Sequence, residues 1–246
     1  MKKFFYSTLL IFFCFSVISF LSTTETKAFE NNAQSVLQLK TSSNDPKGDY
    51  FLGKPEELKS MIQSFVKDNS KLDSAYLYIA ANTAFRLGDM VNAGFLFYAA
   101  QIRKAFDTKR YNLPEPNGNN IRTYLSFLND TVGHNINPVV MASPKDFSTA
   151  INMLESWKVI PEGSPLYKDY GKLAVQEKDW PALANSIKED FMNNFGRKMK
   201  IFFEDPKNAE AFKIVQDYNF KKTPHTPENQ KKYDAAMQIL YQNGVQ

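Results

Sequence analysis

Residues 73–107, DSAYLYIAANTAFRLGDMVNAGFLFYAAQIRKAFD, decide the fold of this chain. Ten of the fourteen residues from Ser74 to Leu87 are apolar, as are twelve of the seventeen from Met90 to Phe106. A helix on a protein surface carries one apolar stripe, whereas a helix that is apolar all round is buried. Gly88 and Asp89 between the two segments supply a left-handed residue after one helix and a cap for the next. The stretch therefore predicts a buried helical hairpin.

Insertion into a membrane is the competing interpretation of the same stretch. Each apolar segment is shorter than the roughly 20 residues that a helix needs to cross a bilayer. Arg86, Asp89 and Arg103 would also lie in or beside the hydrocarbon, which is costly for charged groups. Packing inside a protein core explains the stretch better.

Small residues and one aromatic residue recur along the hairpin at Ala81, Gly88, Ala93, Phe97 and Ala100. In this spacing the hairpin resembles a tetratricopeptide or Sel1-like repeat. The resemblance implies two helices that approach closely at the small residues, with the aromatic ring filling the space between them. It covers about 34 of the 246 residues, without a second copy at the repeat period.

The first 28 residues have the composition of a secretory signal peptide. Lys2 and Lys3 precede the apolar run 4–21, and small residues follow, so we expect cleavage before Phe29. The alternative is an uncleaved membrane anchor, which the polar residues within the run disfavour. The chain is thus expected to be exported, to a periplasmic or extracellular location.

Cysteine usage and charge limit the chemistry of the mature chain. Cys14 is the only cysteine and lies in the predicted signal peptide, which leaves no thiol for disulfides, nucleophilic catalysis or zinc. Cleavage removes three lysines and one glutamate from 30 basic and 26 acidic residues, leaving 27 and 25. This balance does not indicate a nucleic-acid partner.

The rest of the chain reads as one compact all-α domain, residues 51–246, built around the buried hairpin. A polar leader at 29–50 precedes it and is expected to be flexible. Proline in the first turn marks a series of helix starts. A helix is also expected at 121–132, ended by residues 133–137, and Gly196 is expected to kink or end another. The helix-starting prolines are Pro55, Pro144, Pro181, Pro206 and Pro227.

The sequence carries few candidates for catalysis or for binding a cofactor or a metal. His134 and His225 both fall in expected loops, without a second ligand at helical spacing, so no metal site is expected. No glycine-rich phosphate loop occurs, and no cofactor is expected. Acidic residues on polar helix faces could still combine into a hydrolytic site: Glu155, Glu177, Asp179, Glu189 and Asp190.

Two segments are candidates for binding a partner. Tyr78, Asn82 and Arg86 are spaced by four on the first core helix. The repeat resemblance implies that this face lines a concave ligand surface. Alternatively, these side chains form hydrogen bonds with the unpaired backbone groups at the ends of neighbouring helices. Residues 197–203, RKMKIFF, suit contact with a membrane surface or an acidic partner; alternatively, the cations offset a helix dipole and the aromatic side chains fill the core.

Together these features favour an exported, non-enzymatic helical protein that binds another protein. An immunity-type inhibitor of a toxin and a periplasmic adaptor are two concrete versions. The alternative is an envelope-directed hydrolase that uses dispersed carboxylates, which would need two carboxyl groups about 5–9 Å apart in a cleft. The oligomeric state and the partner do not follow from the sequence.

Overall fold

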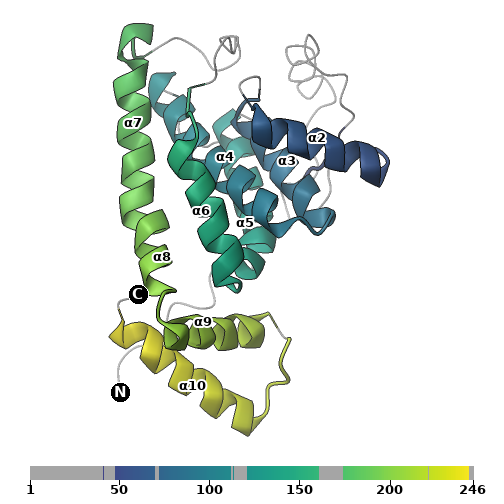
Figure 1. The fold of residues 1–246 in the computed structure, drawn as a ribbon, viewed down its shortest axis with the longest axis vertical. Helices are drawn as coiled ribbons and strands as arrows, with labels where there is room; N and C mark the ends of the chain where they lie inside the picture. Colours follow the sequence, from purple (N-terminus) through teal and green to yellow (C-terminus); the bar gives the residue numbers. More distant parts are fainter. Residues whose placement is uncertain are drawn as a thin grey trace.

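The computed structural model describes residues 41, 48–69, 72–111, 113, 121–160, 174–220 and 222–243, and its fold is all-α (Figure 1). A 3-10 turn, η2 (Glu177–Asp179), precedes α7, and a π-helical turn, η3 (Met192–Gly196), joins α7 to α8. The predicted fold class is confirmed. The α-helices are α2 (Pro55–Lys67), α3 (Ser74–Arg86), α4 (Met90–Arg110), α5 (Ile121–Met141), α6 (Pro144–Ser156), α7 (Trp180–Phe191), α8 (Arg197–Phe202), α9 (Pro206–Asn219) and α10 (Pro227–Gln242).

The predicted hairpin is the centre of the molecule. Its helices are α3 and α4, and residues 77–84 of α3 are buried without exception. The side chain of Asp73 accepts a hydrogen bond from the amide of Tyr76 (2.7 Å), and Asp89 does the same from Asn92 (3.2 Å). Gly88 between them has φ +79°, a conformation that favours glycine. Helix α4 is apolar on all sides because it is surrounded by other helices and contacts α3, α5, α6 and α7.

Helix α5 is longer than predicted. The expected end at residues 133–137 is wrong, because the helix continues through Gly133 and Pro138 to Met141. An internal proline lacks one amide donor and crowds the carbonyl one turn earlier, here that of His134. His134 therefore lies on a helix and not in a loop.

Two glycines mark places where helices almost touch. A Cβ atom on Gly133 of α5 would lie 2.7 Å from Cζ of Phe97, and one on Gly94 of α4 would lie 2.9 Å from a methyl group of Val140. Both distances are shorter than normal carbon contacts, so the absence of a side chain allows the close approach.

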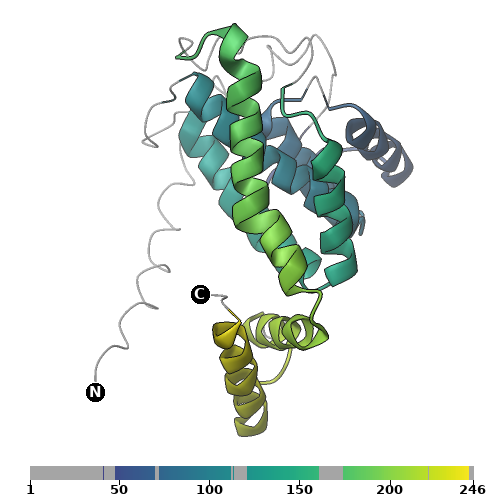
Figure 2. The same cartoon turned by 60° about the vertical axis from the view of Figure 1, so that its left-hand side comes forward.

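Helices α7 and α8, with η3 between them, form a long rod beside α6 (Figure 2). Its aromatic residues pack into the core: Phe195 lies 5.4 Å from Tyr98 and 5.8 Å from Phe147 between ring centroids. Gly196 was expected to kink or end the helix, and it is the last residue of the π turn.

Helices α9 and α10 form a second hairpin below the main body in Figure 1. Both begin as predicted, with Asp205 and Thr226 accepting hydrogen bonds from amides in the first turn. Phe212 of α9 packs on Phe203 (5.3 Å), and Phe220 packs on His134 of α5 (5.4 Å). These ring contacts join the hairpin to the main body.

The predicted signal peptide, residues 1–28, lies outside the described residues. Of the expected leader, 29–50, the structure describes residue 41 and residues 48–50. Thr41 forms an antiparallel bridge with Phe51, and Asp49 is buried. This part of the leader packs on the helical domain.

Candidate functional site

Tyr78, the first predicted binding residue, is fully buried in α3. Its hydroxyl donates to Oδ1 of Asn129 on α5 (3.0 Å), which also accepts from Gln101 on α4 (3.0 Å). Its ring lies 5.8 Å from that of Phe97. Burial raises the pKa of the Tyr78 hydroxyl, and nearby Asp130 adds to the rise. Tyr78 therefore ties three helices together.

Asn82, the second predicted residue, is also buried. Its side-chain amide donates to the backbone carbonyls of Gly48 (2.8 Å) and Asp49 (3.0 Å). One residue further along α3, Thr83 Oγ1 accepts from the amide of Phe51 (2.9 Å). The two side chains hold residues 48–51 along α3.

Arg86, the third predicted residue, reaches the surface at the end of α3. Its guanidinium carbon lies 3.8 Å from the centre of the Tyr50 ring. Phe51 is fully buried and Leu52 is 49% exposed, so buried and exposed side chains alternate along this segment. We call Tyr50, Leu52 and Arg86 the Tyr50–Arg86 patch.

The structure thus brings one of the three predicted residues to the surface and gives the other two internal partners. That these residues bind a partner stays a prediction. Tyr50 and Leu52 were missed because they lie at the border between the expected leader and the domain. The run Tyr50–Phe51–Leu52, directly before a helix start, is the sequence signal that could have revealed them.

A second group of polar residues is buried beneath the start of α3. Asp107 of α4 accepts two hydrogen bonds or ion pairs from Arg110, at 2.9 Å and 2.8 Å, and one from Ser74 (3.2 Å). Arg103 donates to the carbonyl of Leu72 (2.6 Å) and lies over the ring of Trp157 (5.2 Å). Burial raises the pKa of Asp107, and Arg110 opposes that rise. Because these residues are buried, the Asp107 carboxylate lies inside the core and not in a surface cleft.

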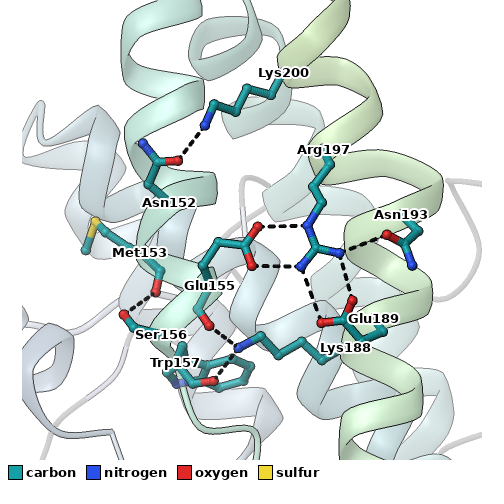
Figure 3. A network of polar contacts seen from close by, with 10 residues as sticks. All are labelled: Asn152, Met153, Glu155, Ser156, Trp157, Lys188, Glu189, Asn193, Arg197 and Lys200. Carbon is teal, nitrogen blue, oxygen red and sulfur yellow. Dashed lines mark hydrogen bonds and ion pairs between the residues drawn. The ribbon is translucent and has the colours of Figure 1, made fainter.

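A third group lies on the surface between α6 and the α7–α8 rod (Figure 3). Arg197 binds Glu155 through Nε and NH2 (2.9 Å and 2.8 Å) and Glu189 through NH1 (2.7 Å). Lys188 donates to the backbone carbonyls of Glu155 (2.7 Å) and Trp157 (2.8 Å) at the end of α6. These bonds join the α7–α8 rod to the C-terminal end of α6.

The same contacts set the protonation of the two glutamates. Hydrogen bonding to Arg197 lowers the pKa of both Glu155 and Glu189. Both carboxyl groups are therefore ionised at neutral pH and turned toward one guanidinium. A general acid needs the opposite shift, so this pair does not have the electrostatics of a glycosidase acid.

The remaining candidates have structural surroundings. His225 stacks on Tyr218 (4.1 Å between ring centroids), whereas His134 packs on Phe220. In the segment 197–203, Phe202 and Phe203 are buried, Arg197 is ion-paired, and Ile201 is 66% exposed. The aromatic side chains of this segment thus fill the core, which was the alternative to contact with a membrane surface or an acidic partner.

The described residues contain no cluster of three or more histidine, cysteine or acidic side chains arranged to hold a metal ion. Within those same ranges, no helix has both the length and the apolar character needed to cross a membrane.

Comparisons with protein-family models, curated proteins and solved structures found no match. The resemblance of residues 73–107 to a tetratricopeptide or Sel1-like hairpin rests on the residues quoted above.

Proposed function

We propose that this protein is an exported, non-enzymatic helical protein that binds another protein through the Tyr50–Arg86 patch. The observation that carries the proposal is the Arg86 guanidinium stacked at 3.8 Å on Tyr50, with the half-exposed Leu52 two residues further along the chain. Tyrosine and arginine are the residue types that most often dominate binding energy at protein interfaces.

The patch is also pre-organised. Asn82 and Thr83 fix the backbone of residues 48–51 to a rigid buried helix, and Tyr50 holds the Arg86 side chain in place. Fixed side chains lose less conformational entropy on binding than mobile ones. An arginine has five N–H donors, so Arg86 can bind a carboxylate of the partner while its face stays on the ring. An immunity-type inhibitor and a periplasmic adaptor both fit this chemistry.

The test is capture of a partner from native cell-envelope extract, with identification by mass spectrometry. We expect Arg86→Ala and Tyr50→Ala each to weaken binding of the captured protein by about 1–3 kcal/mol, with the melting temperature nearly unchanged. Phe127→Ala is the matched control, because Phe127 is a 43% exposed aromatic residue on α5, outside the patch. Equal capture by wild type and both patch variants would refute the proposal.

A further inference from the structure

We infer that the α9–α10 hairpin is a hinged arm, which opens and closes as one unit about residues 203–205 and is held closed by the contact of Phe220 with His134. Neither the hinge nor this contact involves the Tyr50–Arg86 patch, so the arm does not depend on the proposed function.

The two helices of the hairpin are held together by contacts of their own. Near the turn between them, the ring of Tyr218 on α9 lies 4.1 Å from that of His225 and 4.7 Å from that of Tyr233 on α10, between ring centroids. At the opposite end, the side-chain amide of Asn243 donates to Oδ1 of Asn208 (2.6 Å). The hairpin is thus braced at both ends and can move as one body. Its buried apolar side chains are Ala211, Phe212, Val215, Ala236 and Leu240.

The hairpin is attached to the main body much less firmly. Within the described ranges, α9 and α10 contact each other extensively but contact the other helices only sparsely. Figure 1 and Figure 2 both show the hairpin projecting from one end of the main body, below the α7–α8 rod. An element with few contacts to its surroundings is the part of a fold that opens most easily.

Residues 203–205 connect α8 to α9 and form the hinge. Pro206 follows them as the first residue of α9. A proline inside a helix lacks an amide donor and crowds the carbonyl one turn earlier, so α8 and α9 are kept from merging into one continuous helix. The direction of the chain can therefore change at this short linker.

Two contacts lie close to the hinge. Phe212 packs on Phe203 (5.3 Å between ring centroids), and the side-chain amide of Asn208 donates to the carbonyl of Phe202 (3.0 Å). Both α9 residues lie within the first two turns of that helix, where a rotation about the hinge displaces atoms least. These contacts can persist while the rest of the hairpin swings.

The far end of α9 is held by a ring contact. Phe220 directly follows α9 and packs on His134 of α5 (5.4 Å between ring centroids). Because α9 has 14 residues, this contact lies roughly 20 Å from the hinge, where it controls the position of the arm. His134 is exposed and Phe220 is partly exposed, so separating the rings exposes little additional apolar surface. The arm can therefore open without disturbing the core.

Residual dipolar couplings measured by NMR test the arm in the intact protein. We expect the couplings of α9 and α10 in the wild type to fit one common alignment tensor. Phe220→Ala and His134→Ala should each raise the ratio of open to closed arm about 3- to 10-fold, the effect of losing one aromatic pair, and so reduce the magnitude of that tensor relative to the main body. The double variant should match the single variants, because all three lack the same contact.

Phe127→Ala is the matched control, because it removes a 43% exposed ring elsewhere on α5 and should leave the couplings unchanged. An unchanged tensor magnitude in Phe220→Ala and His134→Ala would overturn the inference. So would couplings of α9 and α10 that require two separate tensors. Loss of helical circular dichroism at 222 nm in Phe220→Ala would also count against the arm, because the hairpin would then need the main body in order to stay folded.

Discussion

Substitution of Gly133 by alanine tests the close approach of α5 to α4. The added Cβ would lie 2.7 Å from Cζ and 3.3 Å from Cε2 of Phe97, and the ring cannot move freely because it is buried against Tyr78 (5.8 Å) and Tyr98 (5.5 Å). Overpacking of this kind costs about 1–3 kcal/mol. The better helix propensity of alanine returns up to about 1 kcal/mol.

We therefore expect Gly133→Ala to lower the free energy of unfolding by about 1–2 kcal/mol. Near the melting point of a chain this size, that corresponds to about 2–8 °C. Urea denaturation followed by circular dichroism at 222 nm measures the free energy, and a thermal scan gives the melting temperature.

A double-mutant cycle identifies the cause. Phe97→Leu removes the ring atoms that the new methyl group meets, so Gly133→Ala should become neutral or stabilising by about 0.5–1 kcal/mol in that background. Gly88→Ala is the control: within the described part of the chain, no atom beyond its immediate sequence neighbours lies within 4 Å of the added Cβ, and its cost comes from a φ of +79°. The Gly88 cost should be the same with either residue at position 97. A Gly133→Ala penalty that persists in the Phe97→Leu background would refute the contact as its source.

Three further predictions concern the polar groups. Among the described residues, no group forms a hydrogen bond with the buried hydroxyl of Tyr98, so Tyr98→Phe should raise the free energy of unfolding by about 1–3 kcal/mol. Tyr78→Phe, which breaks the bond to Asn129, should instead lower it by about 1 kcal/mol. A loss of stability in Tyr98→Phe would contradict this assignment. Burial raises the pKa of the Asp73 carboxyl from 3.8 to about 7, so the free energy of unfolding of the wild type should fall by up to roughly 4 kcal/mol from pH 4 to 7. Urea titrations should show no such slope in Asp73→Asn. Hydrogen bonding to Arg197 lowers the pKa of Glu155 and Glu189, so the stabilisation by these ion pairs should decrease below about pH 4 and in high salt. In thermal scans, Arg197→Met should have a lower melting temperature than the wild type in low salt. Its melting temperature should also depend less on salt.

Local sequence signals were reliable where local physics decides the structure. The turn at Gly88, the caps at Asp73 and Asp89 and the proline-marked helix starts depend on neighbouring residues, and the structure has them where they were predicted. The all-round apolar character of the hairpin correctly placed it at the centre.

Signals that depend on distant contacts were misread. Residues 133–137 were expected to end a helix, yet Gly133 serves the contact with Phe97 and the helix continues through Pro138. The even spacing of Tyr78, Asn82 and Arg86 gave no sign that residues 48–51 would lie across this face and that α5 would bury its other end. Whether one face of a helix is exposed depends on which distant segments of the chain pack against it.

The π turn at residues 192–196 determines the direction in which the side chains after it point around the rod axis. A π turn accommodates one residue more than an α-helical turn, and each residue of an α-helix rotates the side-chain direction by about 100°. Deleting one residue within η3 would restore a continuous α-helix and turn the following face by that angle. Arg197 would then point away from Glu155, and Phe203 away from its place against Phe147. The extra residue of the π turn thus keeps the side chains at both ends of the α7–α8 rod directed at α6.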